Sequence, residues 1–101
     1  MKKTTLYIGL NDQFTKTQLI PMMKARDYIV TALTENGVQG MTVYTATGMW
    51  KYEDGTMSTE NTIIVEVMGF DIPATAIDTI KRELNQESVG ISIQEIEVAF
   101  L

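Results

Sequence analysis

Apolar and polar residues alternate near the start of the chain. From Lys3 to Leu10, the apolar residues Leu6, Ile8 and Leu10 fall on one side of the segment. A period of two is typical of a strand with one buried face. Asn11 and Asp12 interrupt the pattern, so we expect a first strand at residues 3–10.

The pattern then changes to spacings of three and four, from about Gln18 to Glu35. The repeating apolar residues are Leu19, Met22, Met23, Tyr28, Ile29, Ala32 and Leu33. This spacing predicts one stripe of an amphipathic helix. Thr15 or Thr17 is the expected cap, and Pro21 fits only the first turn. Asn36-Gly37 supplies the left-handed residue that commonly ends a helix.

Two extended segments follow, at residues 41–51 and from Thr56 to Met68. They are rich in β-branched and aromatic residues, and Asp54-Gly55 lies between them. This arrangement predicts an antiparallel hairpin closed by a tight primed turn, because Asp and Gly tolerate positive φ. In the second strand, Ile63, Val65 and Val67 share one face.

A second helix is expected from Asp71, with Pro73 near its start, and Ile77, Ile80 and Leu84 as its buried seam. The final segment, residues 90–101, has apolar positions that change parity near Gln94-Glu95. A slip of one residue would turn the apolar side to the other face, so we expect a bulge, a bend or the end of a strand there.

The predicted order β-α-β-β-α-β indicates a ferredoxin-like α+β fold. This fold has a four-stranded antiparallel sheet with both helices on one face. At 101 residues, the chain has the size of one domain, and we expect residues 1–101 to form a single ferredoxin-like domain.

The sheet face without helices is unusually apolar for a face exposed to water. The residues expected on it are Tyr7, Tyr44, Ala46, Ile64 and Met68, with Thr5, Thr42 and Glu66. The strand at residues 41–50 has no charge and no proline to discourage pairing with another chain. Both features predict a homo-oligomer, a dimer or a trimer. The alternative is a monomer with scattered apolar surface residues.

Composition narrows the chemistry available to the chain. It has neither cysteine nor histidine, which removes disulfides, thiolates and the commonest metal ligands. We therefore expect no metal and no cofactor. The net charge is −5 and the basic residues are not clustered, which disfavours nucleic acid and anionic membranes as partners. The first ten residues lack the features of a signal peptide, so a cytoplasmic location is expected.

Several side chains are candidates for ligand binding. Tyr7 and Tyr44 either stack a ligand across the open face or lie between subunits, and we favour the second. Trp50 lies on the hairpin beside acidic residues, where it either forms a recognition tip or packs on the sheet or on a neighbouring subunit, and we favour the packing. Glu60 and Glu66 have the same parity but are about 20 Å apart along a strand, which excludes an acid and base pair within one chain.

Gln86, Glu87 and Ser88 follow the second helix. They present an amide, a carboxylate and a hydroxyl to a ligand, or tie the helix end to the last strand. No histidine or lysine lies nearby in sequence to complete a nucleophilic set, so we predict no catalytic residue.

Three segments resemble a bacterial family of small domains of unknown function. They are LYIGLND, GMTVYTATGMWKYEDGTMSTENT and NQESVGISI. The matching positions are Gly40, Thr42, Val43, Ala46, Gly48, Trp50, Gly55, Glu60, Gln86, Glu87 and Ser88. The resemblance covers nearly the whole chain and implies a fold more than an activity.

The layout also distantly resembles the PII-like signalling proteins, which are trimeric ferredoxin-like domains that bind nucleotides between subunits. Those proteins carry a long loop where this chain has a short turn at residues 52–56, and a basic phosphate-binding segment that is missing here. The resemblance therefore implies trimerisation but not nucleotide binding.

Together these features predict a small oligomeric binding or regulatory module without enzymatic activity, with a small molecule or a protein as its partner. Two alternatives remain. One is a cofactor-free enzyme whose pocket lies on the open face or between subunits. The other is an acidic protein that inhibits a nucleic-acid-binding partner by charge mimicry.

Overall fold

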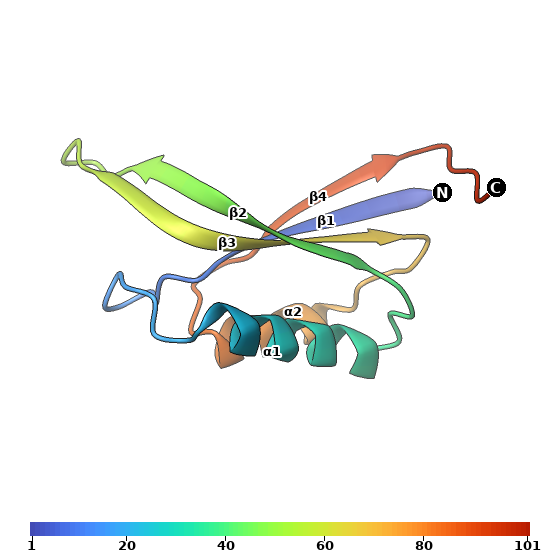
Figure 1. Ribbon diagram of the computed structural model, residues 1–101, viewed down its shortest axis with the longest axis horizontal. Coiled ribbons are helices and arrows are strands. Elements are labelled where there is room, and N and C mark those ends of the chain that lie inside the picture. Colours follow the sequence, from blue (N-terminus) through green and yellow to red (C-terminus); the bar gives the residue numbers. More distant parts are fainter.

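The computed structural model describes residues 1–101 and has the element order β-α-β-β-α-β (Figure 1). The elements are β1 (Lys2–Gly9), α1 (Met22–Glu35), β2 (Thr42–Lys51), β3 (Met57–Met68), α2 (Ala74–Glu83) and β4 (Gly90–Glu95). The strands form one sheet in the order β2-β3-β1-β4, and every neighbouring pair is antiparallel. The predicted ferredoxin-like α+β fold is confirmed.

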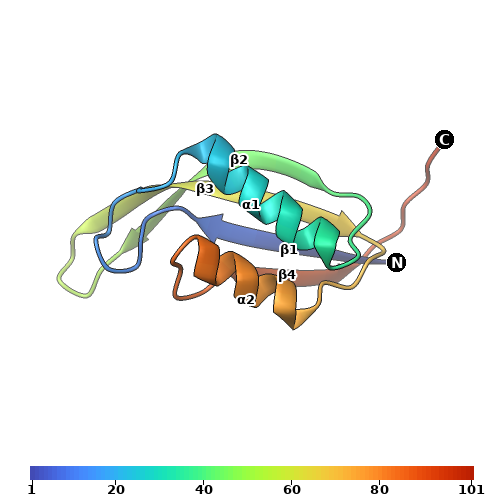
Figure 2. The same ribbon diagram turned by 90° about the horizontal axis from the view of Figure 1, so that it is seen from below.

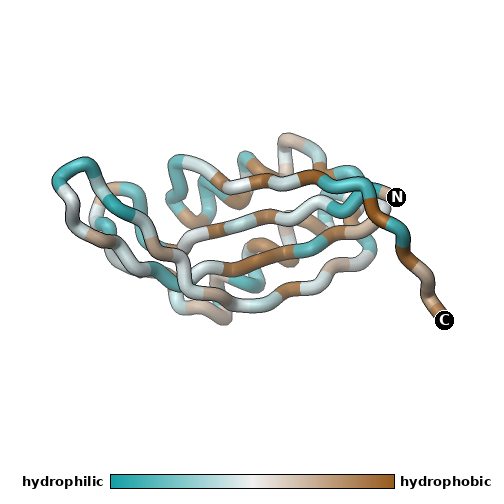
Figure 3. The backbone as a smooth tube through the Cα atoms, turned by 90° about the horizontal axis from the view of Figure 1, so that it is seen from above, coloured by the Kyte–Doolittle hydropathy of each residue, from teal (hydrophilic) through white to brown (hydrophobic).

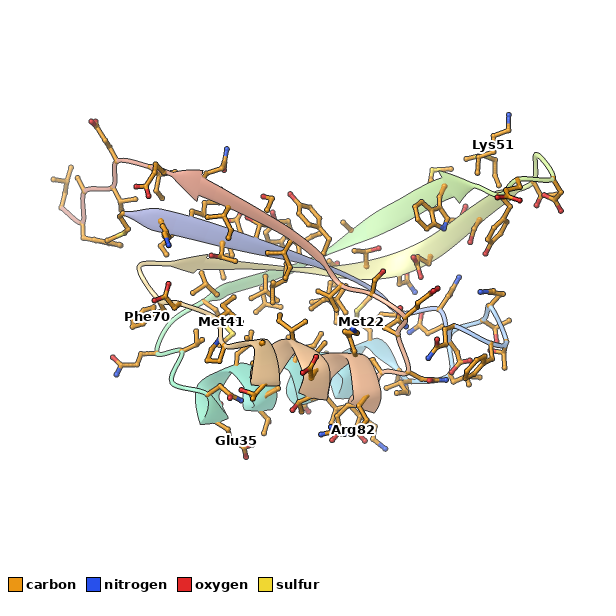
Figure 4. The ribbon with its side chains drawn as sticks, turned by 180° about the vertical axis from the view of Figure 1, so that it is seen from behind. Met22, Glu35, Met41, Lys51, Phe70 and Arg82 are labelled. Carbon is orange, nitrogen blue, oxygen red and sulfur yellow. The ribbon has the colours of Figure 1, made fainter.

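Both helices lie on the same face of the sheet, as Figure 2 shows from below. The core fills the space between the two layers. It consists of Leu6, Ile8, Leu10, Ala25, Ile29, Ala32, Leu33, Val38, Ile63, Val65, Val67, Ala76, Ile80 and Leu84. The labelled side chains of Met22, Met41 and Phe70 lie at the margin of this core (Figure 4). Neither helix is long and apolar enough to span a membrane.

Helix α1 begins later than the sequence indicated. Pro21 is its N-cap, without a side-chain capping hydrogen bond. Gln18 is extended instead, because its backbone forms a β-bridge with Asn11. The predicted caps at Thr15 and Thr17 are wrong, since these residues hydrogen-bond to each other in the loop before the helix. The missing turn also leaves Leu19 exposed.

The hairpin turn also differs from the prediction. Gly55 has a φ of 89° and is the one residue with positive φ in this turn, so Asp54 does not adopt the primed conformation. The Gly55 N–H donates to the Tyr52 carbonyl, and the Tyr52 N–H donates to the Thr56 carbonyl. Asp54 accepts hydrogen bonds from the backbone and the hydroxyl of Thr56. The turn is therefore a wider one that closes through a left-handed glycine.

The second half of the chain follows the predicted order with shifted boundaries. Helix α2 begins at Ala74 behind Pro73, not at Asp71, and it lacks a side-chain cap. Ile77 is only partly buried. Strand β4 ends at Glu95, at the predicted change of parity. The next residue, Ile96, still donates its N–H to the carbonyl of Met1.

The molecule is longer than a compact domain of its size. Its extents are 47 × 25 × 22 Å and its radius of gyration is 14.2 Å, whereas about 13 Å is typical of 100 residues. Figure 1 shows the reason: the β2–β3 hairpin projects beyond the helices at one end, and the C-terminal segment extends at the other. Lys51 marks the projecting hairpin in Figure 4.

Candidate functional site

The sheet face opposite the helices carries an aromatic row at its centre. Tyr7, Ile64 and Tyr44 are direct cross-strand partners on β1, β3 and β2. The tyrosines are 47% and 45% exposed, while Ile64 between them is only 6% exposed. Gly90 on β4 leaves room for Tyr7, because a Cβ at Gly90 would lie 3.2 Å from the Cβ of Tyr7. Figure 3 views this face, which no helix covers.

Glu66 lies at one end of this face, where its charge is balanced. The Tyr44 hydroxyl donates to Glu66 Oε1 over 3.1 Å, and Lys3 Nζ lies 3.4 Å from the same oxygen. Partial burial, followed by the hydrogen bond to Glu66, raises the pKa of Tyr44 above its ordinary value. Lys3, Tyr44 and Glu66 thus form a closed polar cluster beside the aromatic row.

Glu60 lies toward the other end of the same face, in a hollow made by two glycines. A Cβ on Gly9 would overlap with the Glu60 carboxylate. Gly48 is the cross-strand partner of Glu60, and a Cβ there would lie 2.7 Å from the hydroxyl oxygen of Thr62. Side chains at these positions would thus occupy the space that Glu60 and Thr62 now fill.

The backbone of Asn11 connects Glu60 to Gln86. The Asn11 N–H donates to Glu60 Oε2 over 2.9 Å, and the Asn11 carbonyl accepts from Gln86 Nε2 over 2.8 Å. Glu60 and Gln86 are 26 positions apart in the printed sequence, yet they hold the same peptide segment. Gln86 therefore ties the end of α2 to the loop after β1, not to the last strand.

The loop after β1 is held in place by a second set of hydrogen bonds. Asp12 accepts from the backbone N–H groups of Phe14 and Thr15 and from the side-chain amide of Asn85. The hydrogen bond from Thr15, then that from Asn85, lowers the pKa of Asp12 below its ordinary value of 3.8. Gln13 also donates to the side-chain oxygen of Asn85. This network fixes the position of Asn11, and through it that of the Glu60 carboxylate.

The other candidate residues lie apart from this site. Glu87 and Ser88 are exposed and make no side-chain hydrogen bond within the chain. Trp50 is 66% exposed on the projecting hairpin, with the exposed Met49 and Met57 nearby on β2 and β3. In the structure, Tyr7 and Tyr44 thus lie in one cross-strand row on either side of Ile64. Tyr44 hydrogen-bonds to Glu66. Glu60 and Glu66 lie about 20 Å apart along β3.

Sequence reasoning did not identify Gly9, Gly48 and Asn11 as parts of the site. A signal was present, because glycine inside a strand often marks the close approach of another group. Gly9 and Gly48 face the same side of the sheet as Glu60, which the register shows. The contact of Asn11 with both Glu60 and Gln86 depends on the loop conformation, which no periodic pattern encodes.

The site offers carboxylate, hydroxyl, amide and aromatic groups for binding. No three acidic residues come together in a way that would hold a metal ion. Glu60 retains free acceptor capacity, whereas both Lys3 and Tyr44 already contact Glu66. The arrangement is thus suited to recognising a ligand that donates hydrogen bonds.

Proteins of known structure share this fold. A phage SAM lyase in complex with S-methyl-5'-thioadenosine has a TM-score of 0.62 and 18% identity, covering 93% of this chain and 80% of the lyase. The B. subtilis GlnK–ATP complex has a TM-score of 0.55 and 16% identity, covering 95% and 84% of the two chains. CutA from Archaeoglobus fulgidus, a periplasmic divalent cation tolerance protein, has a TM-score of 0.56 and 14% identity, covering 97% and 87%.

At these identities the likeness shows the fold alone, and GlnK agrees with the distant PII-like resemblance. No curated protein matches the sequence. The family model described as a protein of unknown function, DUF3574, matches residues 3–100. The chain therefore belongs to the DUF3574 family.

Proposed function

We propose that this protein is a small homo-oligomeric binding module, a dimer or trimer in which a second copy covers the open sheet face. The observation that carries the proposal is the uncovered row of Tyr7, Ile64 and Tyr44. Two aromatic side chains in one row bury a large apolar area when a partner covers them. The same row in a permanent monomer would face water.

The total surface of the single chain supports assembly. The chain exposes 6566 Å², whereas monomeric proteins of 11.3 kDa expose about 5,700 Å². The excess is similar to the area of about 800 Å² that one partner buries in a standard protein interface. Covering the open face and the projecting hairpin would remove this excess.

The β2 edge supports assembly as well. Residues 42–50 of this edge strand contain no charged residue and no proline. Such an edge offers unpaired backbone groups to another strand. Trp50, Met49 and Met57 project beyond the helices and are all exposed in the single chain. We propose that the hairpin reaches a neighbouring subunit, where these side chains become covered.

The binding role follows from what lies beside the proposed interface. Glu60 and the glycine hollow belong to the same sheet face, so a second copy placed there would close a cleft over them. Two proteins with this fold hold small molecules: the phage SAM lyase holds S-methyl-5'-thioadenosine, and GlnK holds ATP. We infer a small-molecule ligand here, bound between copies.

Light scattering with matched variants tests the assembly. The unmodified protein should have a mass of two or three times 11.3 kDa. Ile64→Lys should reduce the mass to that of a single chain, because a charge would lie inside the proposed interface. Met23→Lys is the control, since Met23 is exposed on α1 in the helix layer. A single-chain mass for the unmodified protein at high concentration would refute the proposal.

One observation favours a second candidate, a cofactor-free enzyme with its pocket between subunits. The TM-score to the phage SAM lyase, 0.62, exceeds those to GlnK and CutA. Tyr7 and Glu66 would line such a pocket from the open face. Incubation of the assembled protein with S-adenosylmethionine, followed by chromatography for S-methyl-5'-thioadenosine, separates this candidate from a module that only binds.

We also propose that this protein is bacterial, that it is located in the cytoplasm and that it binds neither nucleic acid nor membranes. The family resemblance supports a bacterial source, and the net charge of −5 without a basic cluster disfavours nucleic acid and anionic membranes as partners. Cell fractionation with a tagged chain checks the location.

A further inference from the structure

Two isoleucines on β4 are exposed although they face the helix side of the sheet. Ile91 and Ile93 are the cross-strand partners of Leu6 and Thr4 on β1. Leu6 belongs to the core between the sheet and the helices, so both isoleucines lie on the side that carries the helices. They are nonetheless 49% and 63% exposed. Helix α2 therefore leaves this part of β4 uncovered.

A groove of about 360 Å³ lies between β4 and α2. Its apolar lining consists of Leu6, Ile72, Ile77, Ile91 and Ile93. Strand β4 is at the end of the strand order, so its outer edge has no partner strand. The Ile96 N–H points inward to the Met1 carbonyl, and alternate residues of an antiparallel strand point their N–H groups to opposite sides. The N–H groups of Ile91 and Ile93 thus point outward, and the groove combines apolar side chains with free backbone donors.

The projecting β2–β3 hairpin carries two exposed methionines on the same side of the sheet. Met49 is four positions from Thr45, the cross-strand partner of the core residue Ile63, and Met57 is six positions from Ile63 itself. Both methionines therefore face the helix side. They are 67% and 57% exposed, because the hairpin projects beyond the helices (Figure 1). The hairpin and the groove thus expose apolar side chains on the same side of the sheet, where neither has a cover.

One chain cannot bring these two surfaces together. Strands β2 and β4 are the opposite edges of the sheet, and in Figure 1 the hairpin tip and the arrowhead of β4 lie at opposite ends of the molecule. The hairpin of a second copy can reach β4 without a collision of helices, because no helix of its own copy lies below its tip (Figure 1). The C-terminal segment fits the groove less well, since it leaves β4 at Ile96 and extends away from the helices.

We propose that the distal part of the hairpin, residues 47–57, of one copy lies along the outer edge of β4 in a second copy. In this contact β2 extends the sheet of its neighbour, as an uncharged edge strand can. Side chains on neighbouring strands of one face lie about 5 Å apart, so Met49 contacts Ile91 and Ile93 directly. Met57, on the next strand, covers the outer side of the groove. This inference rests on the proposed assembly and names the surface on which the hairpin lies.

Cross-linking between introduced cysteines tests the contact, because the chain has no cysteine of its own. Met49→Cys and Ile93→Cys are prepared separately, one of them with a mass tag, then mixed and treated with a short bismaleimide. We expect cross-linked pairs of unlike chains, and a loss of these pairs when Met23→Cys, on the exposed side of α1, replaces either variant. Cross-links confined to like chains would mean that two equal edges meet, and would overturn the proposal.

Charged substitutions in the full-length chain test the same contact through the affinity between copies. Ile93→Lys and Met49→Lys should each weaken association about tenfold or more, because an apolar side chain leaves the contact and a charge enters it. Both residues are exposed in the single chain, so the fold should be retained, which circular dichroism checks. Met23→Lys is the control and should keep the affinity. Unchanged association of the Met49 variant would refute the contact.

The C-terminal segment is the competing occupant of the groove. Phe100 is 80% exposed in this segment, and Phe100→Lys should leave the cross-linking between positions 49 and 93 unchanged. If the segment fills the groove instead, Ile93→Lys and Phe100→Lys should weaken association while Met49→Lys has no effect. That result would overturn the proposal.

Light scattering on the same mixtures separates this contact from the assembly on which it rests. An assembled protein without cross-links between positions 49 and 93 refutes the placement of the hairpin alone. A mass of one chain at every concentration refutes the proposed function itself.

Discussion

At the scale of single residues, identical side chains on one strand have different roles because of their neighbours. Glu66 forms an ion pair with Lys3 and accepts a hydrogen bond from the Tyr44 hydroxyl, whereas Glu60 lies against Gly9 and accepts one hydrogen bond, from the backbone of Asn11. The parity of the two glutamates was evident from the sequence, and so was their separation along the strand. Their partners were not, because these come from other strands and from the loop after β1.

Asp12 shows the same dependence on partners. Its carboxylate accepts hydrogen bonds from Thr15, Asn85 and Phe14, and these lower its pKa in the folded protein. A carboxylate whose pKa is lower in the folded state than in the unfolded state stabilises the fold at pH values above its unfolded-state pKa. This stabilisation is lost as the pH falls through its folded-state pKa. Asp12 should therefore stabilise the protein at neutral pH and lose its effect in acid.

The variant Asp12→Asn tests this pH dependence. We expect it to lower the urea midpoint at neutral pH, and we expect its difference from the unmodified chain to shrink as the pH falls below about 3.8. Asp71→Asn is the control, because Asp71 is exposed and makes no side-chain hydrogen bond. A neutral-pH midpoint equal to that of the unmodified chain would contradict the role assigned to Asp12.

At the scale of elements, the hydrophobic pattern predicted all six helices and strands and their order. Periodicity is a property of the sequence, so it locates the middle of an element well. Periodicity does not locate the ends of an element as well. Pro21 and Pro73 act as the N-caps where Thr or Asp caps were expected, and Gln18 pairs with Asn11 in place of joining the helix.

The site was only partly predictable for the same reason. Tyr7, Tyr44 and Glu66 were expected on the open face, and their strand register brings them together. The link from Gln86 to Asn11 joins a helix end to a loop, and it follows from the packing of α2 against the rest of the chain. Local sequence patterns do not specify such a contact.

The projecting hairpin offers a direct test of its own. Trp50 is the single tryptophan of the chain and is largely exposed in one copy. If the hairpin contacts a neighbour, Trp50 emission should shift to shorter wavelength and resist acrylamide quenching as the concentration rises. Ile64→Lys should keep the exposed spectrum at every concentration. Emission that stays red-shifted in an assembled protein would place the hairpin outside the interface.

At the scale of the whole molecule, two helices cover one side of a four-stranded sheet and leave the other side open. The chain is elongated, exposes more surface than a compact monomer of its mass and carries its aromatic row on the open side. These three properties have a common explanation if other copies of the chain complete the structure. The Glu60 hollow would then lie at the margin of a subunit contact.

Sedimentation equilibrium of the unmodified chain, from low micromolar to millimolar concentration, tests this explanation most directly. We predict a mass corresponding to a dimer or trimer of the 11.3 kDa chain over most of this range. A mass of 11.3 kDa at every concentration would mean that the tyrosine face is exposed to water in the native protein, and would contradict the account.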